Sequence, residues 1–421
     1  MKITVIDTQN ELTQIQEIAK TERFLLFPVF NDNEHPILAN PVLVLAKPLK
    51  LDELYIIGIS HHECLNIPFD FSIFDKPYIY GKKYFDLQNS LDIDSVYYVS
   101  NKEYTINLFE SQADWQIYPI YKMVDELKDI LNEFSQECLA FDETGRAFRF
   151  LNEITIPSLA AIERNGLKVD NELFTKSFEL PNLIKDSFVY TQYNYLTTTG
   201  RPSSRYGGVN YSALNKANES RKCFTSRFEN GNLFMLDYDS YHLRLIAKLI
   251  NYNLPEGSVH EHLAKQYFNT DVITQELYDE SKKISFRLLY GGVDEKYKGV
   301  KFFADIQLLI DRLWDTHQKL GFMPTIISNI HMQADSKTKL FNYIIQNYET
   351  EQNMLVLKKI FKETTDYKSV PILYTYDSIL FDVKEEETEN YLNIVKTIME
   401  LNGDFPVKVA SGKNYNDLVK I

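Results

Sequence analysis

Two aspartates lie in similar apolar surroundings, in segments that are far apart in the chain. Asp237 follows the run Leu233-Phe-Met-Leu236, and Asp377 is flanked by Ile372-Leu-Tyr374 and Ile379-Leu-Phe381. An unpaired carboxylate in such a run is costly, because a charge leaves water at great expense unless an opposite charge compensates it. The commonest shared purpose of two such carboxylates is to hold divalent metal ions over a phosphate. The pair therefore predicts metal-assisted chemistry on a phosphate.

Strands must position these carboxylates. We expect a buried strand that ends at Asp237 and a hairpin whose tip carries Asp377, which would bring the two side chains together. From residue 200 to the end, strand-like and helix-like stretches alternate. The acidic run 385–389 predicts the solvated start of a helix over 391–401, because negative charge stabilises a first helical turn.

The composition is that of a globular protein with a sizeable core. A chain of 421 residues can hold two or three domains, and 44% hydrophobic residues suffice for their cores. The N-terminal residues lack the apolar region of a secretory signal, and no stretch of about 18 uncharged apolar residues predicts a membrane span. Cys64, Cys138 and Cys223 are odd in number and widely spaced, which fits a reducing compartment without a disulfide framework.

The charge distribution is uneven. The net charge of −14 argues weakly against nucleic acid as a partner. However, the segments 201–227 and 282–301 are rich in Lys and Arg, and together they could line one anionic groove. The alternative is that both segments are ordinary solvated surface.

Residues 1–118 have an α/β pattern. We predict strands at 24–30, 42–46, 55–59 and 95–99 and a short helix over 11–20. Apolar spacing over 121–139 predicts an amphipathic helix. Residues 155–165 predict another helix, with Pro157 in its first turn and Gly166 closing it. Residues 171–199 are irregular and aromatic.

The segment Thr198-Thr-Gly-Arg-Pro-Ser-Ser204, followed by Arg221, is similar to the pattern T-x-T-G-R-x-S-S. It is the first of five segments whose order resembles that of family A DNA polymerases, the class of bacterial DNA polymerase I. The resemblance implies that Arg201 contacts the primer end from the minor groove and that both arginines bind DNA.

The second segment, Leu236-Asp-Tyr-Asp-Ser-Tyr-His-Leu-Arg-Leu245, resembles motif A, D-Y-S-Q-I-E-L-R-x-L. By this resemblance Asp237 binds metal, and Tyr238 and His242 contact the nucleotide. His242 stands where the family has a glutamate that excludes the ribose 2′-hydroxyl. His260, in Ser258-Val-His-Glu261, resembles a family histidine that helps to hold the triphosphate.

The third segment, Lys282-Lys-Ile-Ser-Phe-Arg-Leu-Leu-Tyr-Gly291, resembles motif B. Lys282, Phe286 and Tyr290 are spaced at i+4, so they share one helix face. That face can present an ammonium group to phosphates and two rings to the nucleotide and template. Tyr278 stands where the family has an arginine, and Arg287 stands where it has a glycine.

The fourth segment, Leu340-Phe-Asn-Tyr-Ile-Ile-Gln346, resembles A-x-N-x-P-x-Q-G. Asn342 and Gln346 would present two amides to minor-groove acceptors that every base pair offers. The fifth, Tyr374-Thr-Tyr-Asp-Ser-Ile-Leu-Phe-Asp-Val383, resembles motif C. Its Asp377 matches the second metal aspartate, while Tyr376, expected to contact DNA, replaces a histidine and Ser378 replaces a glutamate.

The resemblance implies a right-hand polymerase built from α/β and α+β domains. We expect an exonuclease-like domain over 1–120, connecting helices and a much reduced thumb over 121–199, and palm and fingers over 200–421, with the fingers at about 245–320. The segment between Asp170 and Gly200 is too short for a full thumb, which predicts poor processivity. The exonuclease chemistry of the family needs four carboxylates. The candidates here are imperfectly spaced, so we expect a degenerate domain. These candidates are Asp32, Glu34, Asp86 and Asp125.

The expected activity is template-directed addition of dNTPs to a primer 3′ end. Asp237 and Asp377 would bind two Mg²⁺ ions, for which Mn²⁺ can substitute, and Lys282 would stabilise charge on the triphosphate. The expected partners are primer–template DNA, dNTPs and a processivity factor or other replisome protein that replaces the thumb. Compact length and abundant Asn, Ile, Lys and Tyr suggest a phage or other mobile element with an AT-rich genome, hence a bacterial host cytoplasm.

Two alternatives stay open. RNA synthesis or primase-like activity with rNTPs would fit His242, which lacks the gate carboxylate, and Tyr376-Asp-Ser378, which is similar to the His-Asp-Ser of single-subunit RNA polymerases. A catalytically weak or dead polymerase fold that serves as a DNA-binding subunit would fit the drift around both aspartates.

Overall fold

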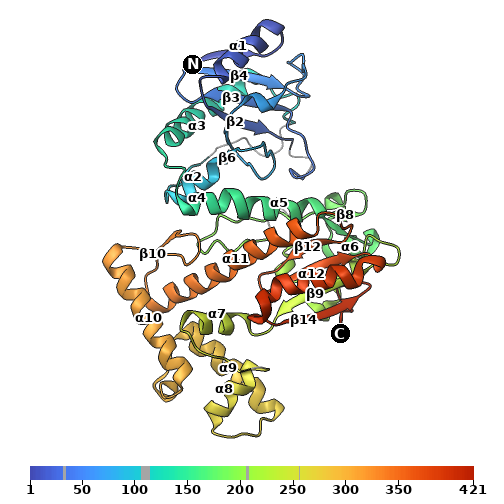
Figure 1. Ribbon diagram of the computed structural model, residues 1–421. Helices are drawn as coiled ribbons and strands as arrows, with labels where there is room; N and C mark the ends of the chain where they lie inside the picture. Colours follow the sequence, from blue (N-terminus) through green and yellow to red (C-terminus); the bar gives the residue numbers. More distant parts are fainter. Residues whose placement is uncertain (32–34, 106–113, 205–207, 256) are drawn as a thin grey trace. The chain divides into compact units, whose positions relative to one another are not determined.

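The computed structural model describes residues 1–31, 35–105, 114–204, 208–255 and 257–421. They form two compact units, Met1–Arg164 and Asn165–Ile421 (Figure 1). The expected subdivision into exonuclease-like domain, reduced thumb, palm and fingers stays a prediction. Within the described residues, every helix is too short or too polar to cross a membrane.

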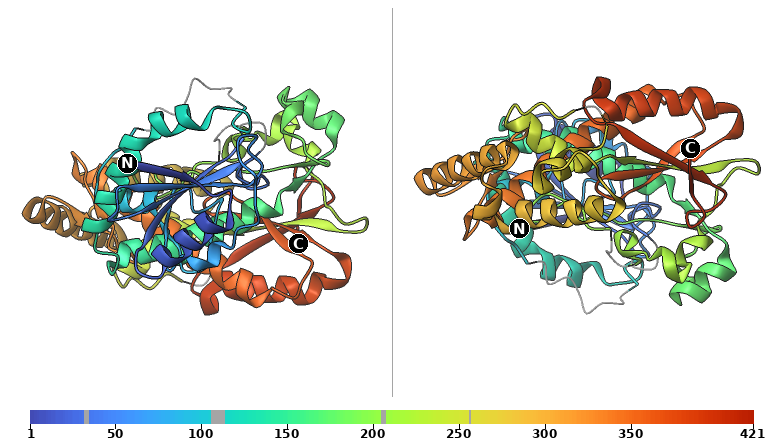
Figure 2. Two further views of the ribbon diagram at one scale, coloured as in Figure 1. Left: turned by 90° about the horizontal axis from the view of Figure 1, so that it is seen from above. Right: turned by 90° about the horizontal axis from the view of Figure 1, so that it is seen from below.

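The second unit is built on a five-stranded antiparallel sheet. Its strand order is β12-β13-β9-β14-β15, so the strand that carries Asp237 is central. In both views of Figure 2 the C-terminal helix α12 lies along this sheet, and its Tyr391 contacts Phe381 of β13. The strands are β9 (Asn232–Tyr238), β12 (Val370–Tyr374), β13 (Ser378–Val383), β14 (Val407–Gly412) and β15 (Val419–Lys420), and the helix is α12 (Thr388–Glu400).

The two faces of this sheet differ. Leu233 and Leu380 pack on the face opposite to Tyr391, in a cluster with Phe174 and Phe224. Because strand side chains alternate, Asp237 shares the face of Leu233. The segment over that face contains α6 (Asn171–Phe178) and the short pair β7 (Leu167–Lys168) and β8 (Phe188–Val189).

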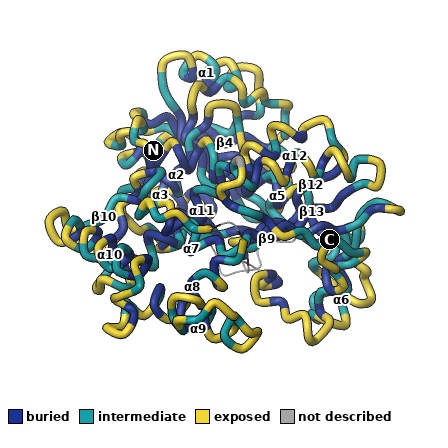
Figure 3. The backbone as a smooth tube through the Cα atoms, turned by 60° about the horizontal axis from the view of Figure 1, so that its bottom comes forward, coloured by how far each residue is buried: buried dark blue, intermediate teal, exposed yellow. Residues whose placement is uncertain are grey.

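A helical layer completes the second unit. Its helices share a second core, in which Leu288, Phe302 and Phe341 are buried. Figure 3 shows exposed and buried residues side by side along the second half of α9, while most residues of β9 are buried. The elements are α7 (Tyr241–Leu249), α8 (Val259–Phe268), α9 (Gln275–Gly291), α10 (Lys301–Leu320), α11 (Lys337–Glu363) and the pair β10 (Met323–Pro324) and β11 (His331–Met332).

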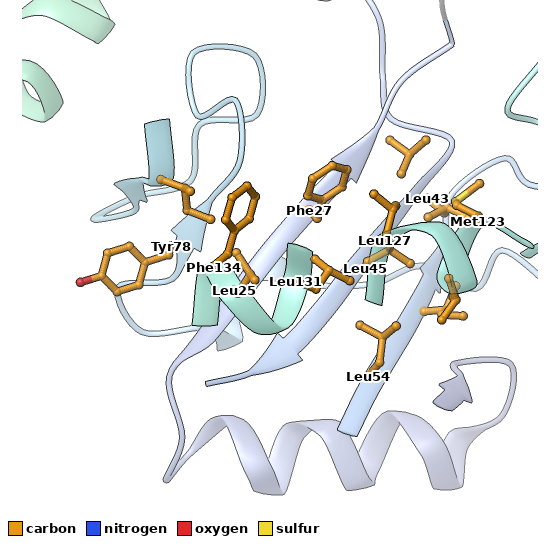
Figure 4. Packing of buried hydrophobic residues seen from close by; sticks show 14 of the residues in the cluster. Leu25, Phe27, Leu43, Leu45, Leu54, Tyr78, Met123, Leu127, Leu131 and Phe134 are labelled. Carbon is orange, nitrogen blue, oxygen red and sulfur yellow. The ribbon is translucent and has the colours of Figure 1, made fainter. Parts of the chain in front are cut away.

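The first unit is a mixed six-stranded sheet with the order β1-β4-β3-β2-β5-β6. Its central strands are buried on both faces, which explains their continuous apolar runs. Leu25 and Leu45 pack against Leu127 and Phe134 of α3 (Figure 4), whereas Leu26 faces the side of α1. The elements are β1 (Lys2–Val5), α1 (Gln9–Ala19), β2 (Phe24–Val29), β3 (Leu43–Pro48), β4 (Glu53–Gly58), β5 (Tyr78–Ile79), β6 (Leu91–Asp92), α2 (Ile93–Val99), α3 (Ile120–Ala140) and α4 (Arg146–Phe150).

Local capping overturned two expectations from the sequence. The strand predicted at 95–99 is wrong, because this segment lies in α2, where the Asp92 side chain accepts a 2.8 Å hydrogen bond from the Ser95 backbone N–H. The segment 171–199 is not wholly irregular, because Asp170 caps α6 by accepting from the N–H groups of Glu172 and Leu173.

The helix predicted over 155–165 is confirmed, but it continues a longer one. It follows α4 through a π-helical turn, η2 (Leu151–Thr155), and ends as α5 (Ile156–Asn165) before Gly166, which has φ +59°. Pro157 lies just after the π turn. Since proline cannot donate a hydrogen bond to the preceding turn, a local π-helical adjustment at this point is physically reasonable.

The half-buried carboxylate of Asp94 makes the stability of the first unit depend on pH. Burial and the neighbouring Asp92 raise the pKa of Asp94 to about 7, although the Tyr104 hydroxyl donates to it. A raised folded-state pKa stabilises the fold fully below the unfolded-state pKa, and this contribution is lost as the pH rises through about 7. We expect Asp94→Asn to increase the free energy of unfolding by about 1–2 kcal/mol at pH 8 and by much less below pH 4.

The measurement is urea unfolding of the full chain in a Trp314→Phe background, where buried Trp115 reports on the first unit. The matched control is Asp129→Asn, on the exposed side of α3. An Asp94→Asn gain that is equal at pH 4 and pH 8 would contradict the electrostatic account.

Candidate active site

The two aspartates come together at one end of the five-stranded sheet. Asp237 is the penultimate residue of β9, and its register partner in β13 is Ser378, the residue after Asp377. The Tyr238 backbone N–H donates a 3.0 Å hydrogen bond to the Asp377 carbonyl oxygen. Tyr376, with φ +68°, forms the left-handed tip of the β12–β13 turn. The predicted strand and hairpin are therefore confirmed, and they bring both aspartates to the same end of the sheet.

Both carboxylates are harder to ionise than ordinary aspartates. Burial and then the charge of Asp377 raise the pKa of Asp237 to about 6. The pKa of Asp377 is raised as well, first because the surrounding protein removes part of its water and then because Glu349 is negatively charged. The residue nevertheless keeps an exposed surface. The pair thus concentrates negative charge that a bound cation would relieve.

A cavity of about 410 Å³ lies next to these carboxylates. All the predicted catalytic and nucleotide-binding residues line it, together with one predicted DNA-binding residue: Asp237, Asp377, Lys282, Tyr238, His242, His260, Phe286, Tyr290 and Arg201. The lining also includes residues that the sequence analysis did not assign to the site, of which the charged ones are Asp239, Glu349 and Lys408.

Helix α9 presents its predicted face to the cavity. The rings of Phe286 and Tyr290 are nearly parallel, with an interplanar angle of 7° and centroids 6.1 Å apart. Phe286 is 48% exposed, so its ring is available to a ligand in the cavity. One turn earlier, the Lys282 ammonium lies 4.6 Å from the centre of the Tyr278 ring. The face therefore offers a cation and two rings in sequence.

His260 lies behind this face. Burial and then the charge of Lys282 lower its pKa to about 4, so the ring is neutral at pH 7. Its Nδ1 is buried and has no hydrogen-bond partner among the described residues. A neutral ring with an unused nitrogen can donate to, or accept from, a ligand that enters the cavity.

A buried glutamate joins three elements of the site. Glu349, on α11 and only 1% exposed, lies 3.2 Å from Arg201 Nη2 and 3.2 Å from His242 Nε2. His242 Nδ1 in turn shares a short hydrogen bond with the Tyr290 hydroxyl. The Arg201 guanidinium stacks 3.7 Å above the Tyr376 ring. Glu349 therefore fixes the cavity wall that lies between Asp377 and α9.

Glu349 was not predicted as a site residue, although its spacing from two predicted site residues indicated a shared helix face. Asn342, Gln346 and Glu349 occur at i, i+4 and i+7, so they lie on one face of the helix. A carboxylate on the face that carries the two predicted DNA-reading amides was a candidate partner for Arg201.

We compared the chain with known proteins. No model of a protein family matches it. Among solved structures, the chain is similar to one described as the POL domain of Pol1 from M. smegmatis in complex with DNA primer-template and dNTP, with a TM-score of 0.75 and 15% sequence identity. The match covers 99% of each chain. The chain has the fold of a DNA polymerase domain. The predicted fold class is confirmed, while a reduced thumb, an exonuclease-like domain and a phage origin stay predictions.

In this polymerase fold, the remaining predicted DNA-binding residues lie outside the cavity lining. The Asn342 side chain donates a 3.3 Å hydrogen bond to the Tyr290 carbonyl oxygen, just behind the wall. Gln346 lies one turn further along α11 and is half-buried. Arg221 donates to the Leu214 carbonyl oxygen at 2.6 and 3.0 Å and stacks on an aromatic ring. These contacts within the chain give Arg221 a structural role that does not require DNA, so its role in DNA binding stays a prediction.

Several cations of the two basic segments have acidic partners within the chain. Arg227 pairs with the buried Asp382 at 2.9 Å, and Arg287 pairs with Asp294 at 3.0 Å. Arg205 lies outside the described residues. A groove that binds DNA would therefore depend on fewer free cations than the sequence suggested.

Two of the four exonuclease candidates, Asp86 and Asp125, lie among the residues that the structure describes, and each has a lysine beside it. Asp32 and Glu34 lie outside the described residues. Asp86 is exposed and 4.0 Å from Lys82, while Asp125 pairs with Lys128 at 2.5 Å. Across the described part of the chain, no three His, Cys, Asp or Glu side chains are grouped to hold a metal ion. The degenerate exonuclease stays a prediction.

Proposed function

We propose that this protein is a template-directed DNA polymerase that adds dNTPs to a primer 3′ end. The observation that carries the proposal is the cavity itself. Two carboxylates on strand ends form one wall, and a cation followed by two rings on α9 lines another. Such a cavity suits a nucleotide, because its phosphates need positive charge and its base needs a stacking surface.

Asp237 and Asp377 would hold the divalent metal ions. They fit this role because they are adjacent carboxylates with raised pKa values, and oxygen ligands of this kind suit Mg²⁺. The remaining ligands would be backbone oxygens, water and substrate phosphates. Two Mg²⁺ ions, or Mn²⁺ in their place, would lower the pKa of the primer 3′-hydroxyl and neutralise charge on the leaving pyrophosphate.

The chain's own side chains would do the binding and positioning. The Lys282 ammonium would bind the triphosphate as a mobile point charge, with His260 beside it. Phe286 and Tyr290 would stack on the nucleotide and the template. Tyr238 and His242 would border the sugar.

DNA contacts would come from the neighbouring wall. Arg201, stacked on Tyr376, would contact the primer end, and Asn342 and Gln346 would reach minor-groove acceptors. A processivity factor or another replisome protein would supply the grip that a full thumb gives. Expression from a phage genome in a bacterial cytoplasm would agree with the residue usage.

RNA synthesis is the second candidate, because His242 lacks the carboxylate that excludes the ribose 2′-hydroxyl in the resembled family, and because Tyr376-Asp-Ser378 is similar to the His-Asp-Ser of single-subunit RNA polymerases. The test is extension of a primed DNA template with Mg²⁺ and either dNTPs or rNTPs. We expect dNTPs to be used at least about 100-fold more efficiently, because the closed His242–Tyr290 contact leaves little room for a 2′-hydroxyl.

Efficient extension with rNTPs alone would identify an RNA polymerase or primase-like enzyme. No extension with either substrate, combined with retained binding of primer–template DNA, would identify a catalytically dead DNA-binding subunit.

A further inference from the structure

The cavity contains a cation that the sequence analysis did not assign to the site. Lys408 lies in β14, directly opposite Asp237 in β9. Side chains of directly paired residues lie on the same face of a sheet, so Lys408 and Asp237 extend to the same side. Lys408 lines the cavity, and its side chain is 51% exposed.

The present partner of Lys408 has a second cation of its own. Lys408 Nζ binds Asp239 Oδ1, and Arg244 Nη2 lies 3.7 Å from Asp239 Oδ2. Arg244 also donates a 2.9 Å hydrogen bond from Nε to the Asp239 carbonyl oxygen. Asp239 would therefore keep a cationic neighbour if Lys408 turned to another anion.

The charge of Lys408 acts on both sides of the cavity. Lys408 lies opposite Asp237 in the sheet, and it contributes to the low pKa of His260. Lys282 on α9 also lowers the pKa of His260, so the two ammonium groups act on His260 from different elements. An anion that bears several charges, bound beside His260, would be attracted by both.

We propose that Lys408 is a second phosphate-binding cation of this site, which turns from Asp239 to the triphosphate of the incoming nucleotide and binds it together with Lys282. This inference rests on the proposed function, since it requires a nucleoside triphosphate in the cavity. It also gives a physical reason why Tyr278 can stand where the resembled family has an arginine, because Lys408 supplies a positive charge from the sheet instead.

The test compares equilibrium binding of dATP and dAMP to the full chain by calorimetry. For Lys408→Met we expect dATP binding to weaken about tenfold and dAMP binding to change less than about twofold, because the lost contact involves the outer phosphates. Lys408→Arg should retain most of the dATP affinity. The matched control is Lys420→Met, which removes an exposed charge from the neighbouring strand β15 that also acts on Asp237.

Equal weakening of dATP and dAMP binding by Lys408→Met, or no difference between Lys408→Met and Lys420→Met, would overturn the inference. Primer extension by the wild-type chain is measured in parallel. If the wild-type chain extended a primer and Lys408→Met bound dATP as tightly as the wild type, the role of Lys408 would be refuted but the proposed function would stand. If Lys408→Met weakened the binding of dATP but not of dAMP, and the wild-type chain extended no primer, the result would support the role of Lys408 and refute the polymerase.

Discussion

Replacing either Asp237 or Asp377 with asparagine is expected to slow primer extension by at least about 10³-fold while leaving the fold intact. Asparagine keeps the shape of the side chain but removes the charge that would bind a divalent cation. The fold should tolerate the change, because backbone hydrogen bonds hold both residues in place and asparagine keeps these bonds. One of them runs from the Tyr238 N–H to the Asp377 carbonyl oxygen. Removing one of two adjacent negative charges also relieves their repulsion.

The measurement is single-turnover extension of a primed template, together with thermal unfolding in the presence and absence of MnCl₂. Wild-type protein should be stabilised by Mn²⁺, since a ligand that binds only the folded state raises its stability. Both variants should lose most of that stabilisation. The control is Asp366→Asn, at an exposed position after α11. Wild-type rates in either aspartate variant would refute the assignment of the catalytic pair.

Replacing Glu349 with alanine is expected to lower both stability and activity. The carboxylate is 1% exposed and lies 3.2 Å from both Arg201 and His242, so its loss leaves these two groups without their shared anion. Removing one partner of a buried ion pair typically costs about 3–5 kcal/mol of stability. Activity should fall as well, because Arg201 and His242 would no longer be held beside Asp377.

The stability change is measured by urea unfolding of the full chain in a Trp115→Phe background, with Trp314 as the reporter of the second unit. Glu363→Ala provides the control, because it removes an exposed glutamate from the last turn of the same helix. Glu349→Gln should lie between wild type and Glu349→Ala, since it keeps the shape and hydrogen-bonding capacity but not the charge. If Glu349→Ala unfolded at the same urea concentration as Glu363→Ala, the carboxylate would have no organising role.

Local sequence patterns predicted the parts of the site that depend on one element at a time. Asp237 and Asp377 stand out because a charge interrupts an apolar strand run, and the hairpin follows from two such runs separated by a short turn. The shared face of Lys282 and Tyr290 follows from helical spacing alone. Each of these inferences needs only a few neighbouring residues.

The parts that depend on pairing between distant segments could not be predicted in this way. Lys408 enters the cavity because of the register between β14 and β9, and register is not visible in either strand alone. Glu349 matters because Arg201 and His242 reach it from separate segments. The strand predicted at 95–99 was wrong for a local reason, since the cap formed by Asp92 outweighed the β-branched and aromatic composition.

We propose that the template chooses the nucleotide that this protein joins to a primer. The most direct measurement is single-nucleotide incorporation with Mg²⁺, in which each of the four dNTPs is offered separately opposite each of the four template bases. If this proposal is right, the primer grows by one residue efficiently only with the complementary dNTP, and this growth is lost in Asp237→Asn. Addition that ignores the template base, or complementary addition that persists in Asp237→Asn, would contradict it.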